Sequence, residues 1–259
     1  MIKQYIVDAF TDTLFHGNQA AVCLLDEWLP DELLMAITRE NRFSETAFLV
    51  GHHLRWFTPG GEIDLCGHAT LASAFVMLKY VCPKKTEIRF QTLSGELMVK
   101  RQKDRYVMTF PAYALTPTPV KKAMEEALGV MPTEAYLGRD LLLVYDDENT
   151  IRQITPDQEK LLQLPGLMVH VTSKGKDYDC VSRSFGPKLA IPEDPVCGSG
   201  HCHIIPYWAS KLHQHDFTAY QASARGGVLY CHAEGQTMTI AGQAVLYAMS
   251  DLHINILAK

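Results

Sequence analysis

The sequence predicts an α+β protein made of two similar halves, in each of which a curled mixed sheet surrounds a central helix. Three observations lead to this prediction. Short strings recur in the same order when the chain is shifted against itself by about 130 residues. Each copy contains a helical stretch that is apolar on nearly every face. Runs of strand length flank these stretches and can cover them.

A proline-aspartate pair opens an amphipathic helix in each half. In the first half, PDELLMAITRE begins at Pro30 and places Leu33, Leu34 and Ile37 on one face. In the second half, PDQEKLLQL begins at Pro156. Two apolar runs of strand length follow each helix, and these are TAFLV and LRWF in the first half, then LMVHV and CVSRSF in the second.

The two copies match most closely around a Cys-Gly pair. RWFTP at 55–59 corresponds to RSFGP at 183–187, and EIDLCG at 62–67 corresponds to EDPVCG at 193–198. Each Cys-Gly begins a helical stretch, GHATLASAFVMLKYV or GSGHCHIIPYWASKL. The first stretch is apolar all round, so strands are expected on most of its sides. Pro206 is expected to bend the second helix, because proline removes a backbone hydrogen bond.

A proline-rich segment marks the boundary between the halves. The segment ALTPTP at 114–119 contains two prolines, which restrict the residues before them to extended conformations. We therefore assign residues 1–113 to the N-terminal half and 114–259 to the C-terminal half. The last ~12 residues are placed to cross back to the first half.

The composition excludes several classes of function. With 259 residues, 47% apolar and 20% charged, the chain reads as an ordinary globular protein. A net charge of −5 argues against a nucleic-acid partner. No stretch is long and apolar enough to span a membrane. Seven scattered cysteines and the lack of an export signal predict a cytoplasmic protein with reduced thiols.

The two Cys-Gly turns are the expected binding site. The start of a helix leaves backbone N–H groups unpaired and carries a partial positive charge. Gly67 and Gly198 let a ligand approach the backbone closely. If a pseudo-twofold axis relates the halves, the two helix starts face a common cleft that can hold an anion, most simply a substrate carboxylate. Either turn alone is more simply structural, and it is the pair in register that favours a ligand site.

Several side chains with useful chemistry lie near these turns. His68 and Ser199 each follow one of the two glycines, and Asp194 precedes the second turn. Glu45 lies in FSETAFLV among apolar neighbours. Apolar surroundings disfavour the ionised carboxylate, so the pKa of Glu45 is expected to rise toward a value useful in proton transfer. The alternative for Glu45 is a surface residue that faces water.

The histidines of the second half do not predict a metal site. His201, His203, His213 and His215 are candidates by residue type. Residues two apart on a helix, however, point to different sides. No metal is therefore expected.

Four strings, taken in order, closely resemble the PhzF-like family, which is named for an isomerase of phenazine biosynthesis. They are VDAFTDTLFHGNQAAVCLL, NRFSETAFLV, RWFTPGGEIDLCGHATLASA and EDPVCGSGHC. The similarity extends from the first strand to beyond residue 210. It implies the diaminopimelate-epimerase fold of two pseudo-symmetric halves, in agreement with the repeat.

The resemblance also implies roles for individual residues. Glu45, in the SET motif, matches the glutamate that takes a proton from one substrate carbon and returns it to another. The catalytic residues that match the family's groups for positioning the substrate and assisting the proton shift are His68, Asp194 and Ser199. The further substrate-binding candidates are Gly67, Gly198, Ser44 and Asn18.

No metal, nucleotide or other cofactor is implied, and a small molecule is the expected partner. A homodimer is the commonest assembly for a soluble protein and is the candidate assembly here, although the sequence does not fix the oligomeric state.

Two alternatives to the Glu45 isomerase stay open. Cys66 and Cys197 occupy matching positions at the two helix starts, where racemases of this fold carry their acid and base. A helix start lowers the pKa of a thiol, so a two-cysteine amino-acid racemase is chemically feasible. Cys197 also stands where threonine is common in the PhzF-like family, which makes the phenazine precursor a poor candidate substrate. A non-catalytic protein that binds a small ligand is the second alternative.

Overall fold

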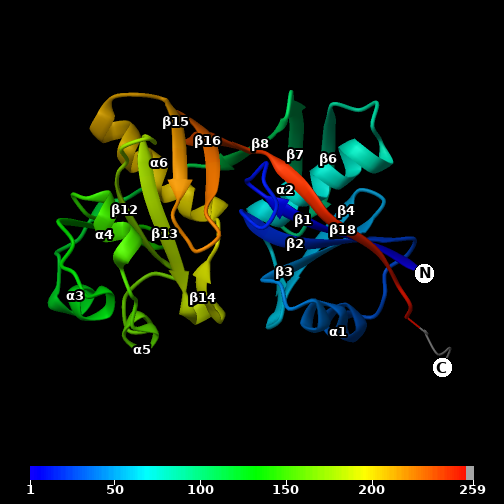
Figure 1. Cartoon of the computed structure of the whole chain (residues 1–259), viewed down its shortest axis with the longest axis horizontal. Coiled ribbons are helices and arrows are strands. Elements are labelled where there is room, and N and C mark those ends of the chain that lie inside the picture. The colour runs from blue at the N-terminus through cyan, green and yellow to red at the C-terminus, as the bar shows by residue number, and fades with distance from the viewer. Residues whose placement is uncertain (255–259) are drawn as a thin grey trace. The chain divides into compact units, whose positions relative to one another are not determined.

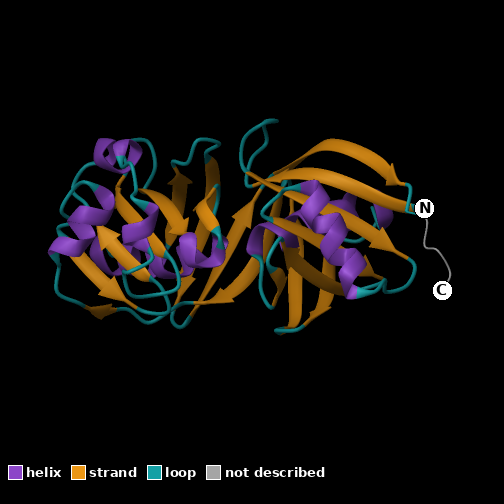
Figure 2. Ribbon diagram, turned by 90° about the horizontal axis from the view of Figure 1, so that it is seen from below, coloured by secondary structure: helices purple, strands orange, loops and turns teal. Residues whose placement is uncertain are grey.

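The computed structural model describes residues 1–254, and the chain forms two compact units. The first unit comprises residues 1–15, 19–108 and the stretch that begins at 243, and the second comprises residues 16–18 and 109–242. Each unit has an apolar core of its own. Figure 1 labels the elements, and Figure 2 shows that strands make up most of both units, with helices packed against them.

The first unit is a mixed sheet with two helices. β2 runs parallel to β3, and β3 runs antiparallel to β4. The elements are β1 (Ile2–Ala9), β2 (Asn18–Leu25), α1 (Asp31–Asn41), β3 (Glu45–Val50), β4 (His53–Thr58), β5 (Gly61–Ile63), α2 (Gly67–Val76), a π-helical turn (Met77–Val81), β6 (Glu87–Thr92), β7 (Gly95–Gln102), β8 (Arg105–Pro111) and β18 (Ala244–Leu252).

The helix α2 is the buried element of the first unit. It starts at Gly67, as the Cys-Gly pattern predicts, and every residue from His68 to Val76 is buried. It packs against β1, β3 and β18. A helix with no polar face is stable only where strands or other helices cover it on all sides, and this sheet supplies that cover.

The strand β18 closes the first unit. It pairs antiparallel with β1, from Ile2 opposite Leu252 to Ala9 opposite Ala244. In Figure 1 it is the red strand labelled beside β1. The sequence analysis predicts that the last ~12 residues cross back to the first half. Five of these residues, 255–259, lie outside the described part of the chain.

The second unit is also a mixed sheet with helices. Its strands include the parallel pairs β11 with β12 and β13 with β15. The elements are β9 (Thr116–Pro117), α3 (Lys122–Leu128), β10 (Glu134–Leu137), β11 (Leu141–Val144), α4 (Glu148–Gln153), α5 (Gln158–Leu161), β12 (Val169–Lys174), β13 (Cys180–Gly186), a 3₁₀ turn (Pro187–Leu189), β14 (Ile191–Asp194), α6 (Gly198–Leu212), β15 (Asp216–Gln221), β16 (Gly227–Glu234) and β17 (Thr237–Gly242).

The helix α6 is the longest helix of the second unit. It starts at Gly198. Of its first ten residues, all but Ser199 and Pro206 are buried. It packs against β12 and β16. The helix continues through Pro206 to Leu212 without interruption.

An arginine-glutamate pair precedes both central helices. Arg55 on β4 donates two hydrogen bonds of 2.7 Å to Glu62 on β5. Arg183 on β13 makes the same bidentate contact with Glu193 on β14, at 2.7 and 2.8 Å. These are the residues that the sequence strings align with one another. Paired hydrogen bonds between a planar guanidinium and a carboxylate fix orientation as well as distance, so each pair holds the short strand before its helix in place.

The predicted fold class is confirmed, since both units combine helices with a mixed sheet. All four predicted strand segments form strands, and the predicted helix at Pro30 forms as α1. The helix predicted at Pro156 is only one turn long, α5. All seven cysteines are free thiols. Within residues 1–254, no helix has the length and apolar character needed to cross a membrane.

Candidate functional site

Glu45 lies at the junction between α1 and β3. The helix α1 ends at Arg42, which adopts a left-handed conformation with φ of 58°. The chain turns there, and Glu45 becomes the first residue of β3, opposite Ala20 of the parallel strand β2. Only 6% of the residue is exposed. The expectation that Glu45 faces a buried environment is therefore correct, and the surface alternative is wrong.

His68 lies against this carboxylate. It is the second residue of α2, and its Nε2 is 3.1 Å from Oε2 of Glu45. Both side chains are almost fully buried. The two atoms are at ion-pair distance but are not aligned for a hydrogen bond, and within the described residues Oε2 has no well-aligned donor. A buried carboxylate oxygen without an aligned donor retains a lone pair that can accept a proton.

The charge of His68 decides the protonation state of Glu45. Burial alone would raise the pKa of Glu45, but the charge of His68 and the polar contacts of His68 and Ser44 with the carboxylate outweigh it and hold this pKa below 4.5. The predicted rise is therefore wrong for the free protein, because the sequence does not show that a cation lies beside the carboxylate. Glu45 is ionised at neutral pH and is ready to act as a base.

The pKa of His68 moves the other way. Burial would lower it, but Cys66 and Glu45 together raise it well above 6.5. The two shifts stabilise the fold in different pH ranges. The contribution of Glu45 is present above pH 4.5 and is lost as the pH falls through its lowered pKa. The contribution of His68 is present below pH 6.5 and is lost as the pH rises through its raised pKa.

Cys66 is the third member of this cluster. It is the N-cap residue of α2, and its Sγ is 3.6 Å from Nδ1 of His68. Burial raises the pKa of the Cys66 thiol, and the charge of Glu45 raises it further, although His68 lowers it. A lowered thiol pKa was predicted from the helix start alone, and that prediction is wrong because desolvation outweighs the helix.

In the second unit, Asp194 and Asn18 are bonded to each other. Asp194 is the last residue of β14, and its Oδ1 accepts hydrogen bonds from Nδ2 of Asn18 at 2.8 Å and from the backbone of Val196 at 3.1 Å. Gln221 secures the same loop from β15. Its Nε2 donates to the carbonyl of Asp194 at 2.6 Å, and its Oε1 accepts from the backbone of Cys197 at 2.8 Å.

The start of α6 repeats the pattern seen at α2. Cys197 is the N-cap residue, and its Sγ accepts a hydrogen bond from the backbone of Gly200 at 3.3 Å. The same sulfur is 3.4 Å from Oγ of Ser199. Gly200 is needed for a steric reason, since a Cβ there would lie 2.7 Å from the ring of His170. Burial raises the pKa of Cys197 well above 9.0, so this thiol is protonated at neutral pH.

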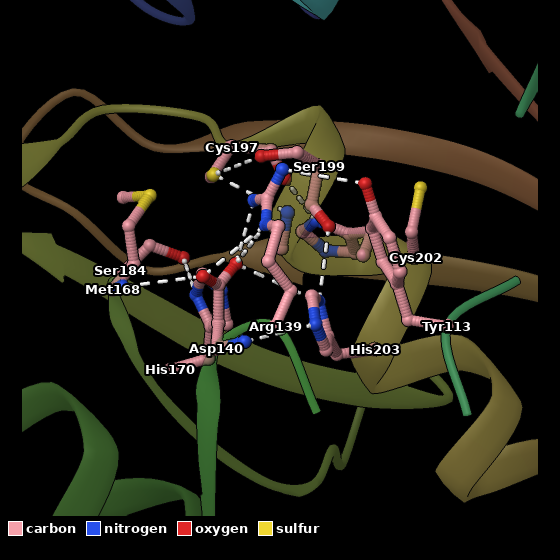
Figure 3. Close-up of polar contacts among 12 residues, drawn as sticks. Tyr113, Arg139, Asp140, Met168, His170, Ser184, Cys197, Ser199, Cys202 and His203 are labelled. Carbon is pink, nitrogen blue, oxygen red and sulfur yellow. Dashed lines mark hydrogen bonds and ion pairs between the residues drawn. The ribbon is translucent and has the colours of Figure 1, made fainter. Parts of the chain in front are cut away.

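A buried polar network supports the first turn of α6 from below (Figure 3). Asp140 precedes β11 and is fully buried, and its Oδ2 is 3.2 Å from Nε2 of His170. His170 in turn contacts Oγ of Ser184 at 3.0 Å. On the other side, His203 accepts a hydrogen bond from the backbone N–H of Asp140 at 3.3 Å. Its Nδ1 faces the carbonyl of Ser199 at 3.3 Å.

Arg139 supplies the positive charge of this network. Its guanidinium donates to both carboxylate oxygens of Asp140, with the shortest contact at 2.6 Å. It also lies over the ring of Tyr113 and donates to the Tyr113 hydroxyl at 3.3 Å. Figure 3 shows the guanidinium pointing toward the start of α6. Burial would raise the pKa of Asp140, but hydrogen bonds and charges from His170 and Arg139 hold it far below its usual range.

Two groups of side chains have the spacing of metal ligands. Glu45 with Cys66 and His68 is one, and Asp140 with His170 and His203 is the other; in each, the ligand atoms lie within 4.8 Å of one another. In the second group the hydrogen bonds account for the arrangement. His203 accepts at Nε2, so its proton is on Nδ1, which lies 3.8 Å from the carboxylate Oδ2 of Asp140. A metal ion would require a deprotonated nitrogen at that point.

The predicted residues fall into two sets, one in each unit. Their assignment as substrate-contacting groups stays a prediction. Sequence reasoning missed the supporting residues. Their only signal is weak, a charged Arg-Asp pair directly before the apolar run LLLV and a histidine inside a buried strand. The first set is Ser44, Glu45, Cys66, Gly67 and His68, the second is Asn18, Asp194, Cys197, Gly198 and Ser199, and the missed residues are Arg139, Asp140, His170 and Gln221.

Replacement of Glu45 by glutamine tests the coupling with His68. The variant Glu45→Gln removes the negative charge, and burial then favours neutral imidazole. We expect the pKa of His68 to fall. Titration of the ring by ¹H–¹⁵N NMR measures this change. Glu148→Gln, in the second unit, replaces another buried glutamate and serves as the control. An unchanged His68 pKa in Glu45→Gln would contradict the coupling.

Replacement of Asp140 by asparagine tests the buried network. The variant Asp140→Asn leaves Arg139 without its counter-ion, and the Arg139 side chain is 33% exposed. We expect a loss of about 2–3 kcal/mol at neutral pH, less than for a fully buried pair because solvent screens Arg139. The stability from Asp140 is present above pH 3.8 and is lost as the pH falls through its lowered pKa. Urea unfolding should therefore show that the difference in free energy of unfolding between wild type and Asp140→Asn is smaller at acid pH than at neutral pH. Asp146→Asn, which replaces an exposed aspartate, is the control. A difference of equal size at both pH values would refute the assignment.

Comparison with known proteins identifies the family. The family model described as "Phenazine biosynthesis-like protein" matches residues 7–250. An uncharacterized isomerase of Pseudomonas aeruginosa is 47% identical, covering 96% of this chain and 97% of its own length. An uncharacterized isomerase of Halalkalibacterium halodurans is 40% identical, with coverage of 96% and 97%.

Solved structures agree with this result. A phenazine biosynthesis protein of the PhzF family from Enterococcus faecalis has a TM-score of 0.95 at 46% identity, covering 98% of this chain and 99% of its own. A predicted epimerase from Pseudomonas aeruginosa has a TM-score of 0.75 at 17% identity, with coverage of 98% and 100%, and so shares the fold. The chain therefore belongs to the PhzF-like, phenazine biosynthesis-like family and is an isomerase.

Proposed function

We propose that this protein is a cofactor-independent isomerase of a small carboxylate-bearing metabolite, with Glu45 as the group that carries the proton. The observation that supports this most directly is the buried, ionised carboxylate of Glu45, 3.1 Å from His68. A carboxylate that is anionic, shielded from water and free of an aligned donor on one oxygen has the properties of a general base.

The proposed reaction moves one proton between two carbons of the substrate. Glu45 takes the proton from the first carbon, and the electron pair of that C–H bond moves into the adjoining unsaturated system. The neutral carboxylic acid of Glu45 then gives the same proton to the second carbon and becomes a carboxylate again. His68 keeps its positive charge while Glu45 is neutral, and this charge then stabilises the negative charge that develops on the substrate.

The family and the two helix starts support the proposed substrate class. Neither α2 nor α6 has an acidic residue in its first turn, so neither helix start is neutralised by its own side chains. Asp194, Ser199 and Asn18 at the second helix start are proposed to bind the substrate, together with the backbone at Gly67 and Gly198. That these residues serve the same substrate molecule as Glu45 stays a prediction, as do the cytoplasmic location and the homodimer.

The two-cysteine racemase is the competing function. Its support is that Cys66 and Cys197 are the N-cap residues of the two central helices. A thiolate is needed to abstract a proton from an α-carbon, but burial raises the pKa of both thiols. The Glu45 carboxylate is already ionised and needs no activation, which favours the isomerase.

Turnover in heavy water separates the two functions. The enzyme is incubated in heavy water with a panel of small unsaturated carboxylic acids and amino acids; chromatography detects an isomerised product, and mass spectrometry detects deuterium bound to carbon. We expect wild type and the control Glu148→Gln to isomerise an unsaturated acid with little uptake of deuterium, because Glu45 returns the proton that it removed. A two-cysteine racemase would instead take up deuterium at the α-carbon of an amino acid. We expect Glu45→Gln to lower the rate of isomerisation at least about 10²-fold, the contribution of a general base.

The double variant Cys66→Ser with Cys197→Ser tests whether the two thiols are needed for the chemistry. Under the proposed function it retains isomerisation, because serine can make the hydrogen bonds of cysteine. An inactive double variant together with a fully active Glu45→Gln would assign the chemistry to the thiols. Tight binding of a carboxylate by wild type, with neither isomerisation nor deuterium uptake, would indicate a binding protein.

A further inference from the structure

Both central helices begin with a cysteine at the N-cap position. The usual N-cap residues are serine, threonine, aspartate and asparagine, whose oxygen atoms accept strong hydrogen bonds from the first turn. Sulfur is a weak acceptor. Cys66 and Cys197 are nevertheless the N-caps of α2 and α6. Helix capping alone does not explain this choice of residue, particularly in both units.

Each cysteine contacts the side chain two residues further along the helix. Sγ of Cys66 is 3.6 Å from Nδ1 of His68, and Sγ of Cys197 is 3.4 Å from Oγ of Ser199. Both sulfur atoms belong to buried residues. The contact between Cys66 and His68 is fully buried, so water does not compete for it, whereas the contact between Cys197 and Ser199 is part-buried. The same local contact therefore occurs at both helix starts, although the partner is an imidazole in one and a hydroxyl in the other.

The contact at α2 completes a line of three groups. His68 meets Cys66 through Nδ1 and Glu45 through Nε2, so the two nitrogens of one ring face two different partners. Rotation of the ring about its Cβ–Cγ bond would break both contacts at once. The histidine is thus held at two points, and the cysteine provides the point that is not itself proposed to take part in the chemistry.

A thiol suits either protonation state of the ring. It donates through S–H when Nδ1 is unprotonated, and its sulfur accepts when Nδ1 carries a proton. A carbonyl oxygen or a carboxylate in the same place could only accept, and would force a proton onto Nδ1. An alanine could do neither. Serine has the same double capacity as cysteine, in a shorter side chain.

We propose that Cys66 is a positioning residue that holds the His68 ring against Glu45, and that Cys197 holds the Ser199 hydroxyl in the same way. Neither thiol exchanges a proton with the substrate in this assignment. The inference rests on the proposed function for the roles of His68 and Ser199 toward the substrate. The contacts of the two cysteines do not depend on it, because they exist without a substrate.

The ring state of His68 tests the role of Cys66 without any substrate. Long-range ¹H–¹⁵N NMR of wild type, Cys66→Ala and Cys66→Ser reports the protonation and tautomer of the ring. We expect Cys66→Ala to shift or split the His68 signals and Cys66→Ser to keep the wild-type pattern. Cys82→Ser replaces a half-buried cysteine beyond the C-terminal end of α2 and serves as the control, with no change in the His68 signals.

Once a substrate is found, its rate of isomerisation provides a second readout. Loss of one hydrogen bond to the ring should lower the isomerisation rate of Cys66→Ala about tenfold, whereas Cys66→Ser should stay within about threefold of wild type. A ring state and a rate that are both unchanged in folded Cys66→Ala would overturn the inference. So would a Cys66→Ser variant that is folded but inactive, since that result requires the thiol itself.

Failure to fold does not remove the test. If Cys66→Ala is unfolded by circular dichroism, the comparison of Cys66→Ser with wild type decides, and a changed His68 ring state in the serine variant refutes the positioning role. The test is also distinct from that of the proposed function. Full activity in Glu45→Gln would reject the proton shuttle and leave the NMR result on Cys66 intact.

Discussion

The contact between the Glu45 carboxylate and the His68 ring is the interaction on which the first unit's site depends. Two charged groups are buried here at 3.1 Å, which is costly unless each compensates the other. The chain can place them together because β3 begins directly after the left-handed turn at Arg42, while α2 delivers its second residue to the same point. The fold thereby sets the charge of a base that the sequence alone leaves ambiguous.

The second unit uses buried charge for a different purpose. Asp140 balances Arg139 and contacts His170, and these residues lie behind the first turn of α6, where Gly200 leaves room for the imidazole. A polar network of this kind gains little net stability over an apolar core, but it orients the groups that it contacts. The first unit buries a pair that is available for chemistry, whereas the second buries one that supports the start of a helix.

Much of the fold could be predicted, because it depends on patterns that act over short distances. Apolar runs gave β3, β4, β12 and β13, and the Cys-Gly pairs marked the starts of α2 and α6. The motifs identified the residues of the site, but they did not predict the direction in which the pKa values of these residues shift. The pKa of Glu45 is lowered by a histidine 23 positions away in the chain (68 − 45 = 23), and burial of the two thiols outweighs the helix starts that suggested reactive thiolates. Such effects depend on contacts between distant segments, which a local pattern does not contain.

The fate of a single labelled hydrogen tests the role of Glu45 most directly. A substrate that carries deuterium at the carbon to be deprotonated is converted in ordinary water in a single turnover, and mass spectrometry locates the label in the product. Because Glu45 is only 6% exposed, its proton should exchange slowly with solvent, and we expect most of the deuterium to appear on the second carbon. Complete loss of the label to water, in an enzyme whose Glu45→Gln variant is equally active, would contradict a shuttle by this carboxylate.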